Sequence, residues 1–282
     1  MGKIVVYHNG KMESGETEVV QEFPLKLIVN QREIATLICS PHDLKYLAVG
    51  FLRLQGFVRT VEDFLMLSVC NDFGIANVGI RGDLPEKLRP VLTSGCGAGI
   101  SFTSNQTTGN LPTRRDTSLR TFQPSEIFGM MEQLARLAEN YKSHGGIHSA
   151  AVGDGTSILL YAEDLGRHNT LDRIAGEALL KGVDLSGTML VTSGRVSTEL
   201  AAKAAMLGIS LIASRTSPTN MAVKMCEEAG IVLIGYVRGG RFSVYTSPER
   251  IACEERMEHP ASGLRIKRNF GVALADGASV SI

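Results

Sequence analysis

Cysteine is the first residue type in this chain whose setting suggests chemistry. Cys96 lies in the stretch LTSGCGAGISFTSNQ, residues 92–106, where glycines flank it and serines and threonines surround it. A thiolate that attacks a partner, carries a sulfur atom and passes it on needs exposure and mobility. Flanking glycines let the backbone approach another molecule closely. These residues favour a functional thiol at Cys96, and an incidental loop cysteine is the alternative.

The other cysteines have more ordinary surroundings. Cys226 falls on the apolar face of a predicted helix and Cys39 follows an apolar run, so we expect both to be buried. Cys70 ends an apolar strand, and Cys253 lies in a predicted charged helix. The five cysteines are odd in number and widely spaced. This pattern predicts reduced thiols in a cytoplasmic protein rather than a disulfide framework.

Arginines follow three predicted strands of the second half, where each strand ends. The turns are TSGRVS, SRTSPT and VRGGR, at 192–197, 214–219 and 237–241. In open α/β sheets ligands sit at the carboxyl ends of strands, helix N-termini favour anions, and guanidinium groups bind phosphate in a bidentate manner. We therefore predict a phosphate or nucleotide site, although solvated surface arginines are the alternative and the standard P-loop and dinucleotide fingerprints are absent. Its candidate residues are Ser193, Gly194, Arg195, Ser214, Arg215, Thr216, Arg238 and Arg241.

Two histidines accompany these turns. His168 lies in EDLGRHNTLDR, at a predicted strand-to-helix junction where Asn169 can cap the helix. His148 lies in the apolar stretch GGIHSAA. Each can be a ligand, an acid–base group or a structural histidine, and the residues leave these alternatives open.

The elements that position these residues fall into three segments, 1–92, 93–122 and 123–282. The first is predicted to contain strands and a helix that Ser40 caps, with Pro41 as its first residue. Residues 93–122 are rich in Gly, Ser, Thr, Asn and Pro, which indicates a mobile loop or linker. The last segment alternates apolar strands and helices, with a hairpin around GDGT and Ser217 as a further helix cap. This alternation predicts a sheet covered on both faces.

Composition excludes several classes of protein. The 282 residues are 44% hydrophobic, which is enough for a substantial core. Lys+Arg and Asp+Glu both number 29, so the overall basic excess of a nucleic-acid-binding protein is missing. No apolar run reaches the length of a bilayer span, and the N-terminus lacks the features of a signal peptide. We expect neither nucleic acid nor membrane as a partner.

The order of several stretches resembles the FdhD/NarQ family, the formate dehydrogenase accessory sulfurtransferases, over about residues 24–250. The stretches are PLKLIVN…CSPHDLKYLAVGFLRLQG, TSGCG, GGIHSAA, EDLGRHNTLDRIAG, VTSGRVSTELAAKA, IASRTSPTNMAV and GYVRGGRFSVYT. The resemblance implies a cytidine-deaminase-like α/β fold, a three-layer sandwich of mixed sheet and flanking helices with a smaller N-terminal α+β subdomain. It also implies a homodimer.

The resemblance further implies an activity for Cys96. A cysteine desulfurase would load it with sulfur as a persulfide. The sulfur would pass to the molybdenum (or tungsten) bis(molybdopterin guanine dinucleotide) cofactor, bound as cargo, for use by formate dehydrogenase. The family's cofactor-binding segment falls on GYVRGGR, and we include both histidines among the candidates. The candidate cofactor-binding residues are then Tyr236, Val237, Arg238, Gly239, Gly240, Arg241, His148 and His168, with the turn residues named above.

This chain departs from two patterns. Many family members carry C-x-x-C in the loop, whereas Gly99 occupies the second position here. A cofactor-binding chaperone without sulfur transfer is therefore the alternative function. Zinc deaminases bind their metal through a His or Cys, a nearby Glu and P-C-x-x-C. Only His168 matches that set, so we expect no tightly bound zinc and disfavour a nucleoside deaminase.

Overall fold

The structure is a computed structural model that describes residues 2–85, 90–93, 99–102 and 120–252. These residues belong to one compact unit, Met1–Ala252. In this part of the chain, no helix combines the length and apolar character needed to cross a bilayer. The elements of the first half are β1 (Gly2–His8), β2 (Lys11–Thr17), β3 (Phe23–Val29), β4 (Arg32–Cys39), α1 (Leu44–Leu54), η1 (Val61–Asp63), β5 (Phe64–Cys70), β6 (Ile75–Ile80), β7 (Pro90–Thr93) and β8 (Gly99–Phe102).

The second half forms a six-stranded sheet of order β10-β9-β11-β12-β13-β14. Its elements are α2 (Pro124–Leu137), α3 (Glu139–His144), β9 (His148–Gly153), β10 (Ile158–Asp164), α4 (Arg167–Lys181), β11 (Met189–Thr192), α5 (Thr198–Met206), β12 (Leu211–Ser214), α6 (Asn220–Ala229), β13 (Val232–Arg238), β14 (Arg241–Val244) and η2 (Pro248–Arg250).

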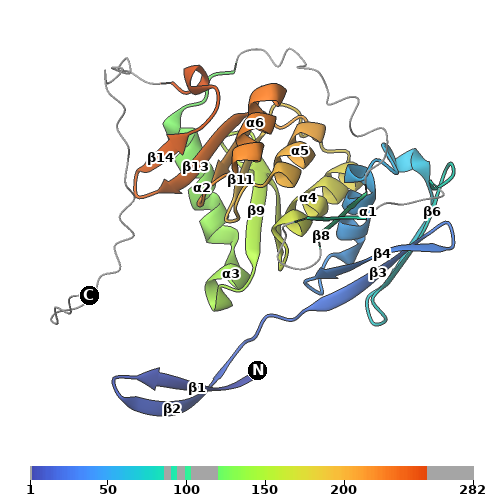
Figure 1. Ribbon diagram of the computed structural model, residues 1–282, viewed down its shortest axis with the longest axis horizontal. Helices are drawn as coiled ribbons and strands as arrows, with labels where there is room; N and C mark the ends of the chain where they lie inside the picture. The colour runs from blue at the N-terminus through green and yellow to red at the C-terminus, as the bar shows by residue number, and fades with distance from the viewer. Residues whose placement is uncertain (1, 86–89, 94–98, 103–119, 253–282) are drawn as a thin grey trace. The chain divides into compact units, whose positions relative to one another are not determined.

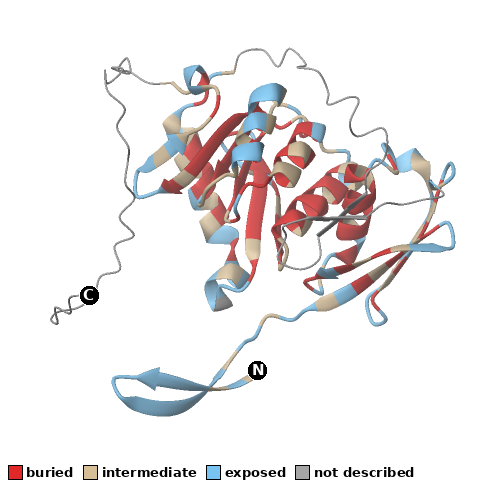
Figure 2. Ribbon diagram, in the orientation of Figure 1, coloured by how far each residue is buried: buried red, intermediate tan, exposed pale blue. Residues whose placement is uncertain are grey.

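Helices cover both faces of this sheet, and most of its central strands are buried (Figures 1 and 2). Alternate residues of the strands enter two separate apolar cores. Val152, Leu190 and Ile212 pack in one core with α4, α5 and α6. Residues of the opposite face, such as Val191 and Ala213, pack with α2 in the other. Because successive side chains of a strand point to opposite faces, continuous apolar strands are buried on both sides. The expected mixed sheet with helices on both faces is confirmed.

Strand direction gathers the predicted turns at one edge of this sheet. β11, β12 and β13 are parallel, whereas β9 is antiparallel to both β10 and β11. The carboxyl ends of β10, β11, β12 and β13 therefore lie at the same edge as the beginning of β9. His148 pairs with Asp164 there, and Thr192 pairs with both Ala150 and Ser214.

A four-stranded sheet of order β4-β3-β6-β5 forms in the first half, and α1 covers it. Its core includes Leu25, Leu27, Leu47 and Phe51. The hairpin of β1 and β2 pairs separately.

The expected Gly- and Ser-rich loop also contains a strand, because Gly99–Phe102 pair antiparallel with Pro90–Thr93. Cys96 and the rest of that predicted loop, except Thr93, Gly99–Phe102 and 120–122, lie outside the described residues.

Two helix caps differ from the sequence prediction. α1 begins at Leu44, and its N-cap is Asp43 in the left-handed conformation rather than Ser40. α6 begins at Asn220, with Thr219 rather than Ser217 as its cap. Each predicted residue instead contacts a distant part of the chain: the Ser40 hydroxyl accepts from the backbone of Leu165, and the Ser217 backbone carbonyl accepts from the backbone of Val196.

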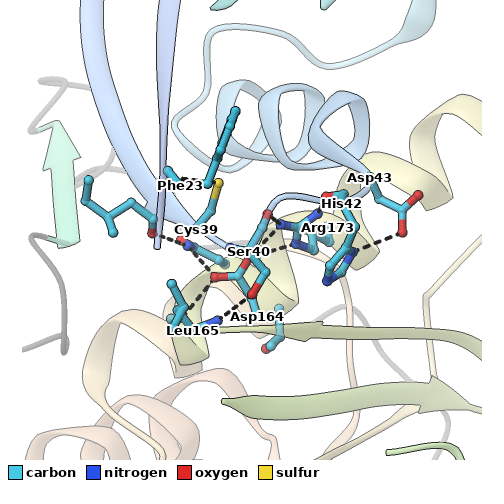
Figure 3. Close-up of polar contacts among 12 residues, drawn as sticks. Phe23, Cys39, Ser40, His42, Asp43, Asp164, Leu165 and Arg173 are labelled. Atoms are coloured by element: carbon cyan, nitrogen blue, oxygen red, sulfur yellow. Dashed lines mark hydrogen bonds and ion pairs between the residues drawn. The ribbon is translucent and has the colours of Figure 1, made fainter. Parts of the chain in front are cut away.

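A buried polar cluster joins the two halves of the chain around Asp164 and Arg173 (Figure 3). The Asp164 carboxylate accepts hydrogen bonds from Arg173 Nη2 at 2.6 Å and from the Ser40 backbone at 3.2 Å. Arg173 also donates to the backbone oxygens of Ser40 and His42. The side chains of Asp164 and Arg173 are 0% and 2% exposed. The segment between β4 and α1 is therefore bound to the start of α4.

Helices α1 and α4 meet through their backbones at two glycines. A Cβ built on Gly50 would overlap the carbonyl of Asp172, and one on Gly176 would overlap the carbonyl of Tyr46. No side chain can therefore be added at this crossing unless the two helices move apart.

We expect Gly176→Ala to lower the free energy of unfolding by about 1–3 kcal/mol or more, because the new methyl group forces the helices apart. Urea denaturation measures the change. Gly129→Ala is the matched control: this glycine lies within α2 with no atom near its Cβ position. There the better helix propensity of alanine should stabilise the protein by about 0.5–1 kcal/mol. Equal effects at the two positions would contradict the close crossing.

Candidate functional site

The three predicted turns are hydrogen-bonded to one another. Ser214 Oγ donates to the Gly194 carbonyl at 2.7 Å, and the backbone N–H of Tyr236 donates to the Thr216 carbonyl at 3.0 Å. We call this surface, residues 193–195, 214–216 and 236–241, the arginine edge. The strand ends that the sequence predicts to be close together are thus held as one framework.

Four guanidinium groups are exposed on the arginine edge. Within the part of the chain that the structure describes, none of the four donates a side-chain hydrogen bond or forms an ion pair, although Arg238 lies 6.0 Å from the ring centroid of Tyr236. The four are Arg195, Arg215, Arg238 and Arg241. Unpaired arginines at one edge form a positive surface that suits phosphate groups.

The turn between β13 and β14 brings two of these arginines face to face. Gly239 and Gly240 have φ values of 58° and 70°, which a two-residue hairpin turn requires. The strand register then places Arg238 opposite Arg241. Like charges directly opposite each other destabilise a hairpin. A bound anion would remove this repulsion.

Tyr236 has a strained backbone beside this hairpin. Its φ is 58°, and the register of β13 and β14 shifts between Gly235 and Arg238. Non-glycine residues in this conformation are uncommon and cluster at functional sites. The shift leaves Val237 buried and Arg238 exposed.

His148 lies beside the first turn of the arginine edge. The backbone of Ser149 donates to Ser193 Oγ at 2.9 Å, and the backbone of Ser193 donates to the Ser149 carbonyl at 2.9 Å. A Cβ on Gly194 would lie 3.3 Å from His148 Nδ1 and 3.0 Å from Arg167 Cβ. Burial and then Arg167 lower the pKa of His148. The ring is therefore a neutral, half-buried neighbour of the turn.

His168 is buried and contacts protein groups through both ring nitrogens. Its Nε2 lies 2.8 Å from Ser197 Oγ, and its Nδ1 lies 3.5 Å from Glu199 Oε2. Burial is the main reason that the pKa of His168 falls to about 4, and Lys203 and Arg167 add to this effect while Glu199 opposes it. These contacts place His168 behind the arginine edge rather than on it.

The N-termini of α5 and α6 already have hydroxyl caps. Ser197 Oγ accepts from the backbone of Leu200, and Thr219 Oγ1 accepts from the backbone of Ala222. Asn169 does not cap α4, because its amide donates to Asp164 Oδ1 and to the Ile38 carbonyl. Part of the hydrogen-bonding capacity of the α5 and α6 N-termini is therefore already used by protein groups.

Sequence reasoning missed the buried partners of this site. Arg167, Ser197, Glu199 and Lys203 all lie behind the arginine edge, and Arg167 and Lys203 are each 4% exposed. The spacing of Glu199 and Lys203, four residues apart on one helix, is the only local signal, and such pairs usually face solvent.

Among the described residues no group of three or more His, Cys, Asp or Glu side chains is placed to hold a metal ion.

Three described cysteines differ in their exposure. Cys39 and Cys226 are buried as predicted, whereas Cys70 is exposed. Burial raises the pKa of both buried thiols to about 12, with a smaller contribution from Asp164 at Cys39 and from Glu227 at Cys226. A thiolate is the reactive form, so neither buried cysteine suits sulfur chemistry near pH 7.

Comparisons with known proteins place the chain among relatives of one family. The model of the FdhD/NarQ family matches residues 20–252. The sulfur carrier protein FdhD of Staphylococcus aureus strain bovine RF122 / ET3-1 is 34% identical over 90% of this chain and 96% of its own length. The protein of the same name from strain Newman is 33% identical with the same coverage. A crystal structure of a candidate formate dehydrogenase accessory protein from Desulfotalea psychrophila superposes with a TM-score of 0.73 and 25% identity, covering 89% of this chain and 98% of that one.

The low pKa of His168 predicts a pH dependence of stability. Unfolded His168 binds a proton as the pH falls through its usual pKa of 6.5, while folded His168 stays neutral until about 4. The unfolded state therefore gains protons first, and the free energy of unfolding falls across this window. At about 1.4 kcal/mol per pKa unit the loss is about 3 kcal/mol.

His168→Gln removes this titration, so the variant should lose about 3 kcal/mol less than the wild type between the same two pH values. Urea denaturation across the range measures both losses, and the subtraction cancels the titration of all other groups. Parallel curves for the two proteins would show that His168 titrates normally in the folded state.

Proposed function

Because the chain belongs to the FdhD/NarQ family, we propose that it is a sulfur carrier protein that serves formate dehydrogenase. In this proposal a cysteine desulfurase loads Cys96 with sulfur as a persulfide. The sulfur then passes to the molybdenum or tungsten bis(molybdopterin guanine dinucleotide), which the arginine edge holds as cargo. The proposal includes a homodimer in the cytoplasm. The names of the Staphylococcus aureus relatives, sulfur carrier protein FdhD, support the sulfur-carrying role.

The arginine edge is the observation that carries the proposal for the cargo. Two guanine dinucleotide arms bring several phosphates, and four exposed guanidinium groups at one sheet edge match that charge. Arg238 and Arg241 face each other across the hairpin, so one phosphate between them can accept from both. Arg195 and Arg215, on the two neighbouring turns, supply the remaining positive charge.

Loading Cys96 is a thiol exchange. The Cys96 thiolate attacks the outer sulfur of the desulfurase persulfide, a new S–S bond forms at Cys96, and the desulfurase cysteine leaves as a thiolate. No net oxidation occurs, so one cysteine suffices. Cys39 and Cys226 are poor alternatives because burial keeps their thiols protonated. Cys70 is exposed and serves as a natural comparison.

Delivery of the sulfur to the metal also requires a source of electrons. Release of the outer sulfur as sulfide takes up two electrons and returns Cys96 as a thiol. In a C-x-x-C loop the second thiol can attack the persulfide, form a disulfide with the first cysteine and so release the outer sulfur. Gly99 occupies that position here. We infer that a thiol reductant from outside the loop supplies the electrons.

Incubation with a cysteine desulfurase and cysteine should add the mass of one sulfur atom to the peptide that contains Cys96. Mass spectrometry without reductant measures this gain, and a reductant should reverse it. The Cys96→Ser variant should not carry this sulfur and should fail to support active formate dehydrogenase.

Cys70→Ser is the matched control, because it removes an exposed thiol and should leave both sulfur loading and formate dehydrogenase activity unchanged. Full formate dehydrogenase activity with Cys96→Ser would refute sulfur transfer through Cys96. A cofactor-binding chaperone would then be the better interpretation.

Guanosine 5′-diphosphate tests the arginine edge, because it carries the pyrophosphate of one cofactor arm. We expect Arg238→Ala to weaken its binding roughly tenfold or more, since a charge-assisted hydrogen bond is lost. Titration calorimetry at low and high salt measures the affinity. Arg136→Ala, which removes an exposed arginine of α2, is the control and should bind as the wild type does. Unchanged affinity in Arg238→Ala and also in Arg241→Ala would exclude the hairpin as a phosphate site.

A further inference from the structure

A chain of buried polar groups extends from the arginine edge into the protein. Ser197, the cap of α5, contacts His168 Nε2 at 2.8 Å. His168 Nδ1 lies 3.5 Å from Glu199 Oε2. Residues Ser197 and His168 are each 6% exposed. The chain links the beginning of α4, which contains His168, to the beginning of α5, which Ser197 caps.

An ionic cluster forms the inner end of this chain. Lys203 Nζ lies 2.9 Å from Asp172 Oδ1 and 3.2 Å from Glu199 Oε1. Its side chain is 6% exposed, and that of Asp172 is 2% exposed. A buried ammonium group between two carboxylates holds Glu199 as an acceptor of hydrogen bonds.

The acceptors and donors of the chain determine which nitrogen of His168 carries the proton. The Glu199 carboxylate lies 3.5 Å from Nδ1 and is negatively charged, so it favours a hydrogen rather than a lone pair on that nitrogen. Nε2 then accepts from the Ser197 hydroxyl, and Ser197 Oγ still accepts from the backbone of Leu200. Burial is the main cause that keeps the ring neutral near pH 7; Lys203, Arg167 and His148 act in the same direction, and Glu199 opposes them.

We propose that His168 is a positioning residue of the arginine edge: as a neutral ring protonated on Nδ1, it fixes the start of α5 through Ser197 and so holds the turn that carries Arg195. This inference rests on the proposed function, because it assigns His168 a role behind the cargo site instead of contact with the cargo.

The geometry explains why one hydrogen bond can matter for that turn. Its first end is fixed by the bonds between Ser193 and Ser149, and its middle by the bond from Ser214 to Gly194. Ser197 is its last residue, and His168 is the side chain that holds the Ser197 hydroxyl. Without His168 the exit of the turn keeps its backbone bonds, the buried Val196 side chain and the bond from Leu200 to Ser197, but loses the contact that orients the Ser197 hydroxyl, so we expect the backbone at Arg195 to shift.

The tautomer provides a test that needs no ligand. Long-range ¹H–¹⁵N NMR of the wild-type protein, with histidine signals assigned by comparison with His168→Gln, should show His168 neutral and protonated on Nδ1 near pH 7. Protonation on Nε2, the tautomer that predominates in free histidine, would overturn the inference.

Two variants of His168 distinguish a role in positioning the turn from a general effect on folding. His168→Phe removes the hydrogen bond with Ser197 and the polar contact with Glu199, whereas His168→Gln keeps a side-chain amide that can accept from Ser197. We expect the amide signals of Ser193–Val196 to shift in the Phe variant and to stay near their wild-type positions in the Gln variant. Guanosine 5′-diphosphate should bind roughly tenfold more weakly to the Phe variant, because small misplacement of binding groups costs this much or more.

Each outcome has a distinct meaning. If the folded Phe variant keeps both the wild-type amide signals and the wild-type affinity, His168 does not position the turn. If the wild-type protein itself fails to bind guanosine 5′-diphosphate, the cargo site of the proposed function fails, while the tautomer and the amide signals still decide the role of His168.

Discussion

The buried carboxylate of Asp164 holds together parts of the chain that are far apart in sequence. It accepts hydrogen bonds from Ser40 before α1, from Gly166 and Asn169 at the start of α4, and from Arg173 two turns further along α4. Burying a charge away from water costs free energy unless the charge is paired and hydrogen-bonded. Removal of one partner from a buried pair lowers the free energy of unfolding by about 3–5 kcal/mol. The start of α4 is therefore constrained in position and direction, and the placement of His168 follows from that constraint.

The topology of the six-stranded sheet brings the candidate site residues together at one edge. Parallel strands end at a common edge, so turns that are 20 or so residues apart in sequence become neighbours. Backbone bonds between Thr216 and Tyr236, and the bond from Ser214 to Gly194, keep the three turns in register. The exposed guanidinium groups thus stand on a framework that is fixed before any anion arrives, which reduces the entropy cost of binding.

The sequence is informative where structure is local. Burial of Cys39 and Cys226, the hairpin around Asp154 and Gly155, and the arginines at strand ends follow from apolar runs and turn residues. The caps expected at Ser40 and Ser217 are wrong because contacts with distant residues compete with local capping. The pairing of His168 with Ser197 and Glu199 crosses two helices, so spacing along the chain contains no sign of it. Cys96 lies outside the described residues, and its role stays a prediction.

The crossing of α1 and α4 at Gly50 and Gly176 has a mechanical consequence. Where side chains separate two helices, their rotamers can adjust and absorb small displacements. Here backbone lies against backbone, so this contact has no compressible layer. A displacement of α1 at this crossing would therefore displace the backbone of α4 with it.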